Sequence, residues 1–146
     1  IDAETASKIV WLDSFISNID RTVKNTNMLM FNKELWLIDH GSSLSFHHAW
    51  MNISERAKSP FPFVKEHVLL GQAALLEETN TAFKALLTPE KIRIIVNMIP
   101  DAWLDWPDLD QSPEEIREVY FQFLATRLKH ADIFTQQAKD ARAALI

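Results

Sequence analysis

Apolar residues recur at helical spacing along most of this chain, and this pattern predicts a mainly α-helical fold. The first stripe lies near the N-terminus and is formed by Ile9, Trp11, Leu12, Phe15 and Ile16. Similar stripes predict helices over residues 72–87, 89–99, 113–128 and 133–145. We expect these stripes to pack together as the core of a single domain.

Two of the predicted helices carry start signals. Thr88 precedes Pro89, which is the usual order of an N-cap and a first helical residue, and Pro100 ends the same segment. Ser112 is followed three residues later by Glu115, which is the spacing of a capping box. Both helices are therefore predicted to begin where these residues stand.

One short region departs from the helical pattern. Met28–Phe31 and Leu35–Ile38 are two apolar runs around the polar residues 32–34. Two such runs around a short polar loop predict a β-hairpin, here with a three-residue loop that lacks the usual glycine. A hairpin folds the chain back on itself, so the residues before its first strand and after its second strand should meet.

Those meeting residues are Asp20 and Asn25 on one side and Asp39 on the other. Phosphoryl transfer from ATP uses one carboxylate to take the proton of the acceptor hydroxyl. It uses a second carboxylate and an amide oxygen to hold magnesium ions. Kinases present an Asp, an Asn five residues later, a hairpin, and an Asp before Gly. Asp20 and Asn25 keep the five-residue offset, and Asp39-His40-Gly41 follows the hairpin.

The region from Asn18 to Trp50 contains Asn-x-Asp-Arg-x-x-x-Asn-x-Asn followed by Leu-Trp-Leu-Ile-Asp-His-Gly-x-x-Leu-x-Phe-His-His-x-Trp. It resembles the HipA-like kinase family of bacteria, and the likeness continues through residues 87–90 and 99–104. The resemblance implies a protein-kinase-like fold, ATP and Mg²⁺, and transfer to a Ser or Thr hydroxyl. Residue by residue, it implies that Asp20 is the catalytic base and that Asn25 and Asp39 are metal ligands.

Asn18 stands two residues before Asp20, where eukaryotic-type protein kinases and aminoglycoside phosphotransferases carry His, and this departure argues against both. A plainer alternative is that Asp20, Asn25 and Asp39 only cap and turn the chain, since these residue types favour such positions.

Three neighbours of this set are candidates for contact with the nucleotide. Arg21 follows the predicted base and would hold a phosphate, or would pair with Asp13 or Asp39, which is the structural alternative we favour. Lys24 would stabilise charge on the γ-phosphate, or would simply be a solvated loop lysine. His40 occupies the middle of Asp-x-Gly and is expected to hydrogen-bond to the loop that carries Asp20.

Composition narrows the range of functions. The chain has 146 residues, 47% hydrophobic and 24% charged, as is ordinary for one globular domain. A net charge of −5 gives no basic footprint for nucleic acid or an anionic membrane, and no apolar run approaches the ~20 residues that span a bilayer. No signal peptide is evident. The absence of cysteine fits a cytoplasmic location and excludes thiolate chemistry.

The kinase interpretation predicts that this chain is only a C-terminal lobe, spanning residues 1–146. The sequence has two glycines, Gly41 and Gly71, so it has no Gly-rich loop to cover ATP. The partner would be an N-terminal lobe of the same protein, the protein substrate is unspecified, and the chain alone should be inactive. The alternatives are a non-catalytic module derived from a kinase and a helical interaction protein unrelated to kinases.

Some remaining segments allow narrower expectations. Residues 55–63, with two prolines, are predicted to be a loop suited to substrate contact, and residues 101–111 a loop that Trp103 and Trp106 anchor to the core. His47 and His48 are adjacent, so on an extended segment they would point to opposite sides. We therefore expect one of them to pack against Phe46 or Trp50 rather than to share a metal ion.

Overall fold

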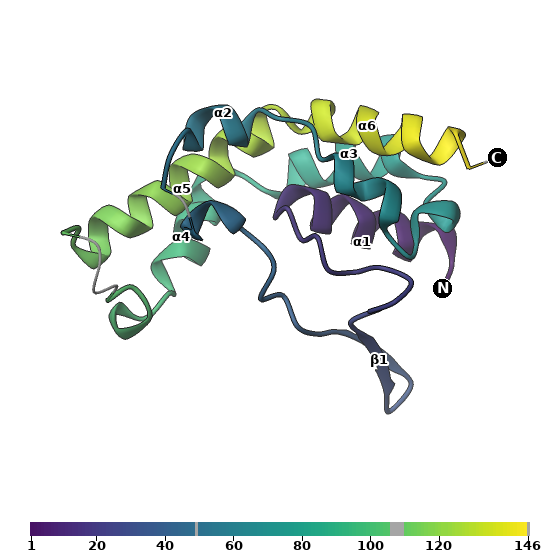
Figure 1. The fold of residues 1–146 in the computed structure, drawn as a ribbon, viewed down its shortest axis with the longest axis horizontal. Coiled ribbons are helices and arrows are strands. Elements are labelled where there is room, and N and C mark those ends of the chain that lie inside the picture. The colour runs from purple at the N-terminus through teal and green to yellow at the C-terminus, as the bar shows by residue number, and fades with distance from the viewer. Residues whose placement is uncertain (49, 106–109, 146) are drawn as a thin grey trace.

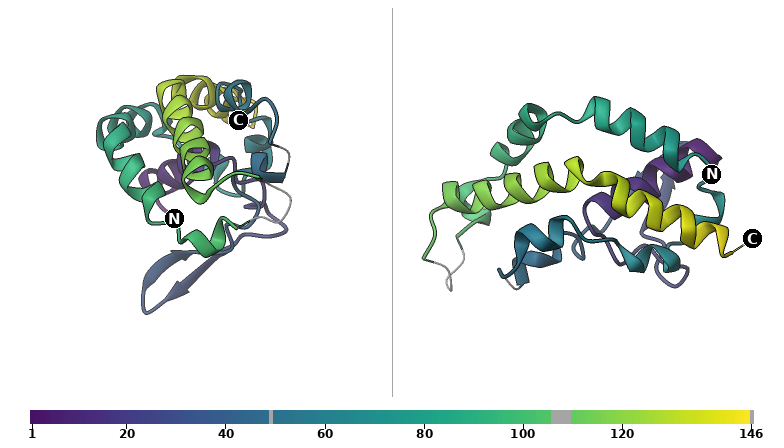
Figure 2. Two further views of the ribbon diagram at one scale, coloured as in Figure 1. Left: turned by 90° about the vertical axis from the view of Figure 1, so that its left-hand side faces the viewer. Right: turned by 90° about the horizontal axis from the view of Figure 1, so that it is seen from above.

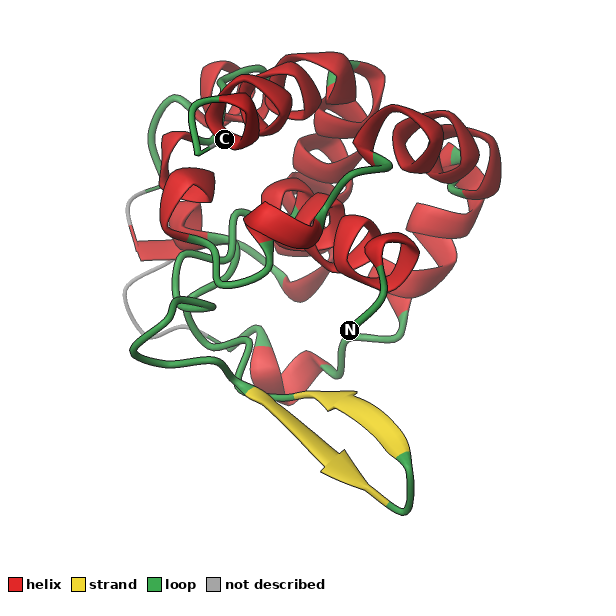
Figure 3. Ribbon diagram, turned by 90° about the vertical axis from the view of Figure 1, so that its right-hand side faces the viewer, coloured by secondary structure: helices red, strands yellow, loops and turns green. Residues whose placement is uncertain are grey.

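The structure is a computed structural model that describes residues 1–48, 50–105 and 110–145, without the side chains of His47 and His48. Six α-helices and one two-stranded sheet lie within this part of the chain. The helices form an elongated body from which the hairpin projects (Figures 1 and 3). The predicted fold, mainly helical with one small hairpin, is confirmed at this level. The α-helices are α1 (Ala3–Phe15), α2 (Ile53–Ala57), α3 (Leu76–Leu86), α4 (Pro89–Asn97), α5 (Pro113–Lys129) and α6 (Ala131–Ala143).

Helices α5 and α6 run along the middle of the body, with α3 and α4 on one side and α2 on the other (Figure 2). Helix α1 packs against α3, α5 and α6. Short 3₁₀ turns connect these helices: η1 (Ser45–His48), η2 (Pro62–Glu66), η3 (Leu70–Gln72) and η4 (Asp101–Trp103).

Trp11 lies at the centre of one part of the core. Its side chain is buried, and its ring contacts Phe15, Phe83 and Phe134 with centroid distances of 5.2, 5.0 and 5.4 Å. The indole N–H donates to Asn80 Oδ1 at 3.0 Å, so burying this polar group leaves no unpaired donor. Trp11 thus joins helices α1, α3 and α6.

A buried arginine joins α5 to two other segments. Arg127 donates to the main-chain oxygen of Ser14 at the end of α1, at 2.6 Å. It also donates to the main-chain oxygens of Ala57, the last residue of α2, and of Ser59, just after that helix, at 3.4 and 3.1 Å. Burial lowers the pKa of Arg127 to about 10. The guanidinium therefore fixes the end of α1 relative to the segment after α2.

The predicted helix starts are confirmed. Thr88 Oγ1 accepts from the Lys91 N–H at 3.3 Å. Ser112 and Glu115 form both bonds of a capping box, at 2.8 and 3.3 Å. These signals act over three residues, which is why the sequence alone was sufficient to locate them.

The hairpin pairs β1 (Met28–Phe31) with β2 (Glu34–Leu37), in the antiparallel register Met28 with Leu37 and Phe31 with Glu34. The predicted three-residue loop is wrong, because the turn contains only Asn32 and Lys33. Their φ angles are 51° and 66°, which a two-residue turn of type I′ requires at both positions. Asn tolerates this left-handed backbone without glycine.

Several other expectations need correction. Residues 55–57 belong to α2 instead of a loop, and α3 begins at Leu76 because residues 70–72 form a separate 3₁₀ turn. Trp103 is 73% exposed, so it is not a core anchor. Trp106 lies outside the described residues, as do the side chains of His47 and His48 for which a packing role was expected.

Three apolar positions of the predicted stripes are also exposed. Leu75, Leu86 and Ile95 are 36%, 55% and 54% exposed, although all three fall on the stripes predicted over residues 72–87 and 89–99. Helix α4 packs on α5 along one side, so the rest of its surface faces outward. Periodicity identified the helices but overestimated the width of their buried faces.

Candidate functional site

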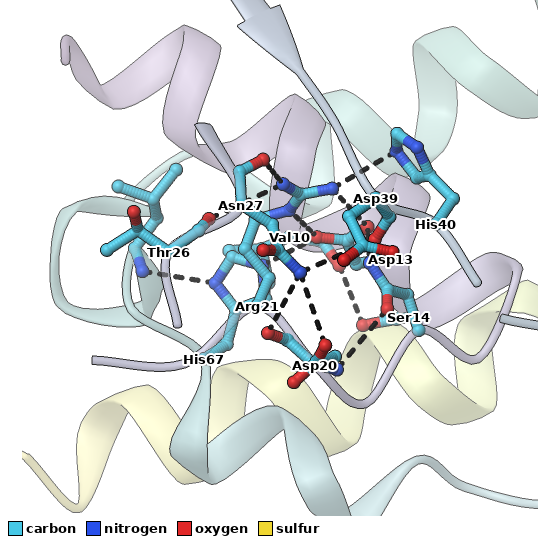
Figure 4. Close-up of polar contacts among 12 residues, drawn as sticks. Val10, Asp13, Ser14, Asp20, Arg21, Thr26, Asn27, Asp39, His40 and His67 are labelled. Carbon is cyan, nitrogen blue, oxygen red and sulfur yellow. Dashed lines mark hydrogen bonds and ion pairs between the residues drawn. The ribbon is translucent and has the colours of Figure 1, made fainter. Parts of the chain in front are cut away.

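The hairpin brings together the two segments that were expected to meet, and Asn27 is the residue that connects them. Its amide nitrogen lies 3.3 Å from Asp20 Oδ2 and 3.4 Å from the main-chain oxygen of Asp39 (Figure 4). The Asn27 main-chain oxygen accepts from the Ile38 N–H at 3.0 Å, which extends the ladder beyond the strands. The loop before β1 and the residues after β2 therefore share one buried amide.

Asp20 and Asn25 are in direct contact across their five-residue offset. The Asn25 amide nitrogen donates to Asp20 Oδ2 at 2.9 Å. Asp20 is half-buried and Asn25 is exposed, so the pair lies at the surface. The carboxylate of Asp20 is thus oriented by two amides that both bind the same oxygen.

The residues on either side of the hairpin have an unusual backbone. Asn27 and Asp39 have φ angles of 46° and 51°, in the left-handed region. Asn and Asp reach this region more readily than other residues with a side chain. Such conformations often mark functional sites, where the surrounding structure maintains them.

Asp39 precedes Gly41, but the structure does not explain the glycine through the backbone. The φ of Gly41 is not positive. A Cβ there would lie 3.5 Å from Asp39 Oδ1, an ordinary contact distance. The carboxylate of Asp39 therefore lies beside Gly41, and both residues are exposed.

Beneath this surface, Asp13 of α1 is the centre of a buried polar network. Its carboxylate accepts from Arg21 Nε at 2.5 Å, from Asn18 Nδ2 at 3.0 Å and from His67 Nε2 at 2.9 Å. The Leu69 N–H donates to His67 Nδ1 at 3.0 Å, so the hydrogen of the ring is on Nε2.

The charge of Asp13 is stabilised despite its position. Burial by itself raises the pKa of this carboxyl group. Hydrogen bonds from His67, Arg21 and Asn18, together with the charge of Arg21, outweigh burial, and the net pKa is lowered. Asp13 is therefore an ionised carboxylate at neutral pH, although its side chain is fully buried.

Arg21 extends this network to the base of the hairpin. Its Nη1 donates to the main-chain oxygens of Thr26 and Asn27. Its Nη2 lies 3.1 Å from His40 Nε2, which must accept because arginine only donates. The expected pairing of Arg21 with Asp13 and the expected bond from His40 to this loop are both present. A nucleotide-binding role for Arg21 and His40 stays a prediction.

The side chain of Asn18 connects Asp13 to the main chain of Asp20. Its side chain donates to Asp13, and its Oδ1 accepts from the Asp20 N–H at 3.3 Å. The residue two positions before Asp20 thus links the buried carboxylate to the exposed one.

A distant segment supports the same loop from the other side. Thr22 forms an isolated antiparallel bridge with His67, and the Val68 N–H donates to the Arg21 main-chain oxygen at 3.0 Å. These contacts join two segments that are more than 40 residues apart. The loop that carries Asp20 and Asn25 is consequently bonded to α1, to the hairpin and to residues 67–68.

Lys24 precedes Asn25 on the same loop, and among the residues that the structure describes its side chain bonds to none of the other candidates. It is exposed and lines an open depression of about 820 Å³ with Lys65, Glu66 and His67. A contact between Lys24 and the γ-phosphate stays a prediction.

The donor atoms suit a hard cation. Mg²⁺ prefers oxygen ligands and retains several waters, binding through one or two carboxylates and substrate phosphates. Asp20 and Asp39 carry carboxylates, and the Asn25 oxygen is the amide atom that does not face Asp20. Within the described residues, no three His, Cys, Asp or Glu side chains gather as a metal site. An ion here would therefore depend on these few oxygens, with water and phosphate completing its shell.

Sequence reasoning missed Asn27, Asp13 and His67 as parts of this site. Asn27 ends the quoted motif, and its position before the hairpin was the available signal. Asp13 was considered only as a partner of Arg21. No signal pointed to His67, which lies 54 residues from Asp13 in sequence.

Comparisons with known proteins found no match among protein-family models, curated proteins or solved structures. The residues that the structure describes include no helix both long and apolar enough to cross a membrane.

Proposed function

We propose that this chain is the C-terminal catalytic lobe of a HipA-like Ser/Thr protein kinase, which transfers the γ-phosphate of ATP to a hydroxyl group. The observation that carries the proposal is the amide of Asn27, which contacts the Asp20 carboxylate and the main chain of Asp39. This amide joins the loop that carries Asp20 to the residue after β2, and this proximity supports the proposal of a shared base-and-metal site. The motifs from Asn18 to Trp50 support the same assignment through their resemblance to that family.

Asp20 is the base in this proposal. Two amides bind its Oδ2, which leaves Oδ1 to orient the acceptor hydroxyl and take its proton. Asn18 positions the main chain of Asp20, and the buried Asp13–Arg21 pair positions the loop as a whole. Bonds within the chain therefore hold Asp20 and its loop in this arrangement.

Asp39 and the Asn25 oxygen would hold Mg²⁺, which supplies neutralisation of the phosphate oxygens when bound. Arg21 and His40, whose side chains bond to each other, would contact the nucleotide beside this site. In this proposal an N-terminal lobe of the same protein covers ATP, and no transfer activity is assigned to residues 1–146 alone.

The experiment is a γ-phosphate transfer assay on the intact gene product, with whatever sequence flanks these 146 residues. Asp20→Asn keeps the hydrogen-bonding shape of the side chain but removes the base, so transfer should fall at least ~100-fold. Asp140→Asn, at an exposed position on α6, is the matched control and should retain activity. Retained transfer by Asp20→Asn would exclude the assignment of the base.

The alternative function is a non-catalytic interaction module, and the outer face of the hairpin favours it. Leu29, Phe31 and Trp36 are 41%, 60% and 50% exposed on this face. Exposed apolar patches often mark protein interfaces. This alternative predicts no binding of magnesium–ATP by the intact protein, whereas the kinase proposal requires such binding.

A further inference from the structure

A small pocket is lined in part by Ile19, the residue before Asp20. Its volume is about 190 Å³, and its lining includes Ile19, Phe46, Arg56, Phe61, Phe63 and Phe123. Pockets for drug-sized ligands occupy about 300–1,000 Å³. The space therefore suits one large side chain, not a nucleotide.

The walls of this pocket are mainly aromatic. Phe46 and Phe123 are buried, with ring centroids 4.4 Å apart, and Phe61 is buried beside them. Ile19 and Phe63 are 44% and 52% exposed and lie where the pocket meets solvent. An apolar side chain that enters would remove these two residues from water, which favours its binding.

Arg56 gives the pocket its charge. Among the lining residues that the structure describes, it is the one with a charged side chain. Its Nη2 donates to Ser45 Oγ at 3.1 Å, which holds the guanidinium against the wall. A positive group beside an apolar pocket favours an occupant with a carboxylate next to its apolar side chain.

The pocket and the loop that carries Asp20 are fixed to the same buried residue. Arg127 binds the main-chain oxygens of Ala57 and Ser59 on the pocket side. It also binds the main-chain oxygen of Ser14, shortly before that loop. The pocket therefore keeps its place relative to the loop without help from a ligand, which lowers the cost of binding.

We propose that this pocket receives a bulky apolar, preferably aromatic, side chain of the phosphoacceptor polypeptide, with an acidic residue beside it. The inference rests on the proposed function in that it takes Asp20 as the base. Successive Cα atoms are ~3.8 Å apart, so the main chain of Ile19 is immediately beside that of Asp20. An extended peptide advances ~3.3–3.6 Å per residue, so the side chain in the pocket belongs within a few positions of the acceptor Ser or Thr.

The test measures peptide binding to the ¹⁵N-labelled intact gene product by NMR titration, without nucleotide. The probes are acetyl-Ala-Ser-Phe-Asp-Ala-amide and the same peptide with Ala in place of Phe or Lys in place of Asp. We expect shifts at Ile19 and Phe61 and about tenfold weaker binding of the Ala peptide, the low end for burying an aromatic side chain. The Lys peptide should also bind more weakly.

Variants separate the pocket from other apolar surfaces. Phe63→Ala should weaken binding of the Phe peptide about tenfold, because an exposed wall of the pocket is lost. Phe31→Ala, next to the hairpin turn and 60% exposed against 52% for Phe63, is the matched control and should leave binding unchanged. Arg56→Gln should abolish the preference for the Asp peptide over the Lys peptide.

The outcomes distinguish this inference from the proposed function. Equal binding of the Phe and Ala peptides, no binding at millimolar concentration, or shifts confined to the hairpin would overturn the pocket assignment, whatever the transfer assay gives. Phe-dependent binding together with an intact gene product that transfers no phosphate would support the pocket as a peptide site and reject the kinase.

Discussion

Asp13 and Arg21 form an ion pair with Nε and Oδ2 2.5 Å apart and both side chains fully buried. The pair joins α1 to the loop that precedes the hairpin, and His67 and Asn18 complete the hydrogen bonding of the carboxylate. A buried pair of this kind is costly to break, because removing one charge leaves the other uncompensated. The surface residues Asp20 and Asn25 thus depend on a charge pair that solvent does not reach.

We predict that Asp13→Asn destabilises the protein by ~3–5 kcal/mol, since Arg21 would remain as a buried unpaired cation. Urea unfolding followed by circular dichroism measures the change. Asp140→Asn replaces an exposed aspartate and should stay within ~0.5 kcal/mol of the wild type. Equal stability of the two variants would mean that the pair contributes little.

The Asp13 carboxylate makes the free energy of unfolding depend on pH. Its folded pKa is lowered from 3.8, so in acid the unfolded chain binds more protons than the folded chain. The stabilisation is fully present above pH ~4 and is lost as pH falls through the lowered pKa. Unfolding measured from pH 7 to pH 2 should therefore show a steeper acid loss in the wild type than in Asp13→Asn. Parallel curves would contradict this account.

We expect Asn27 to stabilise the protein through its side-chain hydrogen bonds and not through its backbone conformation. Asn27→Gly keeps access to positive φ but removes the amide that contacts Asp20 and Asp39, so we expect a loss of ~1–3 kcal/mol. Asn32→Gly makes the same change at another left-handed position, in the exposed turn, and should be neutral or slightly stabilising. Thermal unfolding of the two variants provides the comparison, and a larger loss for Asn32→Gly would contradict it.

Arg127 should not be replaceable by lysine. The guanidinium reaches the main-chain oxygens of Ser14, Ala57 and Ser59 at once, and a single ammonium lacks this planar fork. We expect Arg127→Lys to cost at least ~2 kcal/mol in urea unfolding, because buried carbonyl groups lose their donors. Arg142→Lys, at a residue whose Nε donates to the Gly71 main-chain oxygen near the surface, should change stability by less than ~0.5 kcal/mol. A tolerated Arg127→Lys would show that these carbonyls find other donors.

Local signals account for most of what the sequence predicted correctly. The N-caps at Thr88 and Ser112 and the two strands act over a few residues, so their evidence is contained in short segments. The two-residue turn was missed because Asn32-Lys33 adopts positive φ without a glycine. The α2 helix was missed because it has only five residues, too few for a clear apolar stripe, and the prolines at 60 and 62 that follow it favour a loop.

In the candidate site, too, local features were predicted and contacts between distant segments were not. The expectation that the segments carrying Asp20, Asn25 and Asp39 meet followed from the hairpin, which is a local feature. The contacts from His67 to Asp13 and from Arg127 to Ser14 join residues 54 and 113 positions apart, and spacing along the chain does not encode them. Such pairings depend on how the helices pack, so the sequence alone indicated the Arg21–Asp13 pair but not the contributions of His67 and Arg127.

The hairpin register limits how this chain can change in length. Met28 pairs with Leu37, and the ladder continues to the bond between Asn27 and Ile38. Residues added near the tip leave Asn27 and Asp39 together only if both strands grow equally. An odd insertion within one strand would turn its following side chains to the opposite face. The hairpin can thus change in length by two residues at a time, one in each strand. Its two ends stay joined at Asn27 and Ile38 whatever its length.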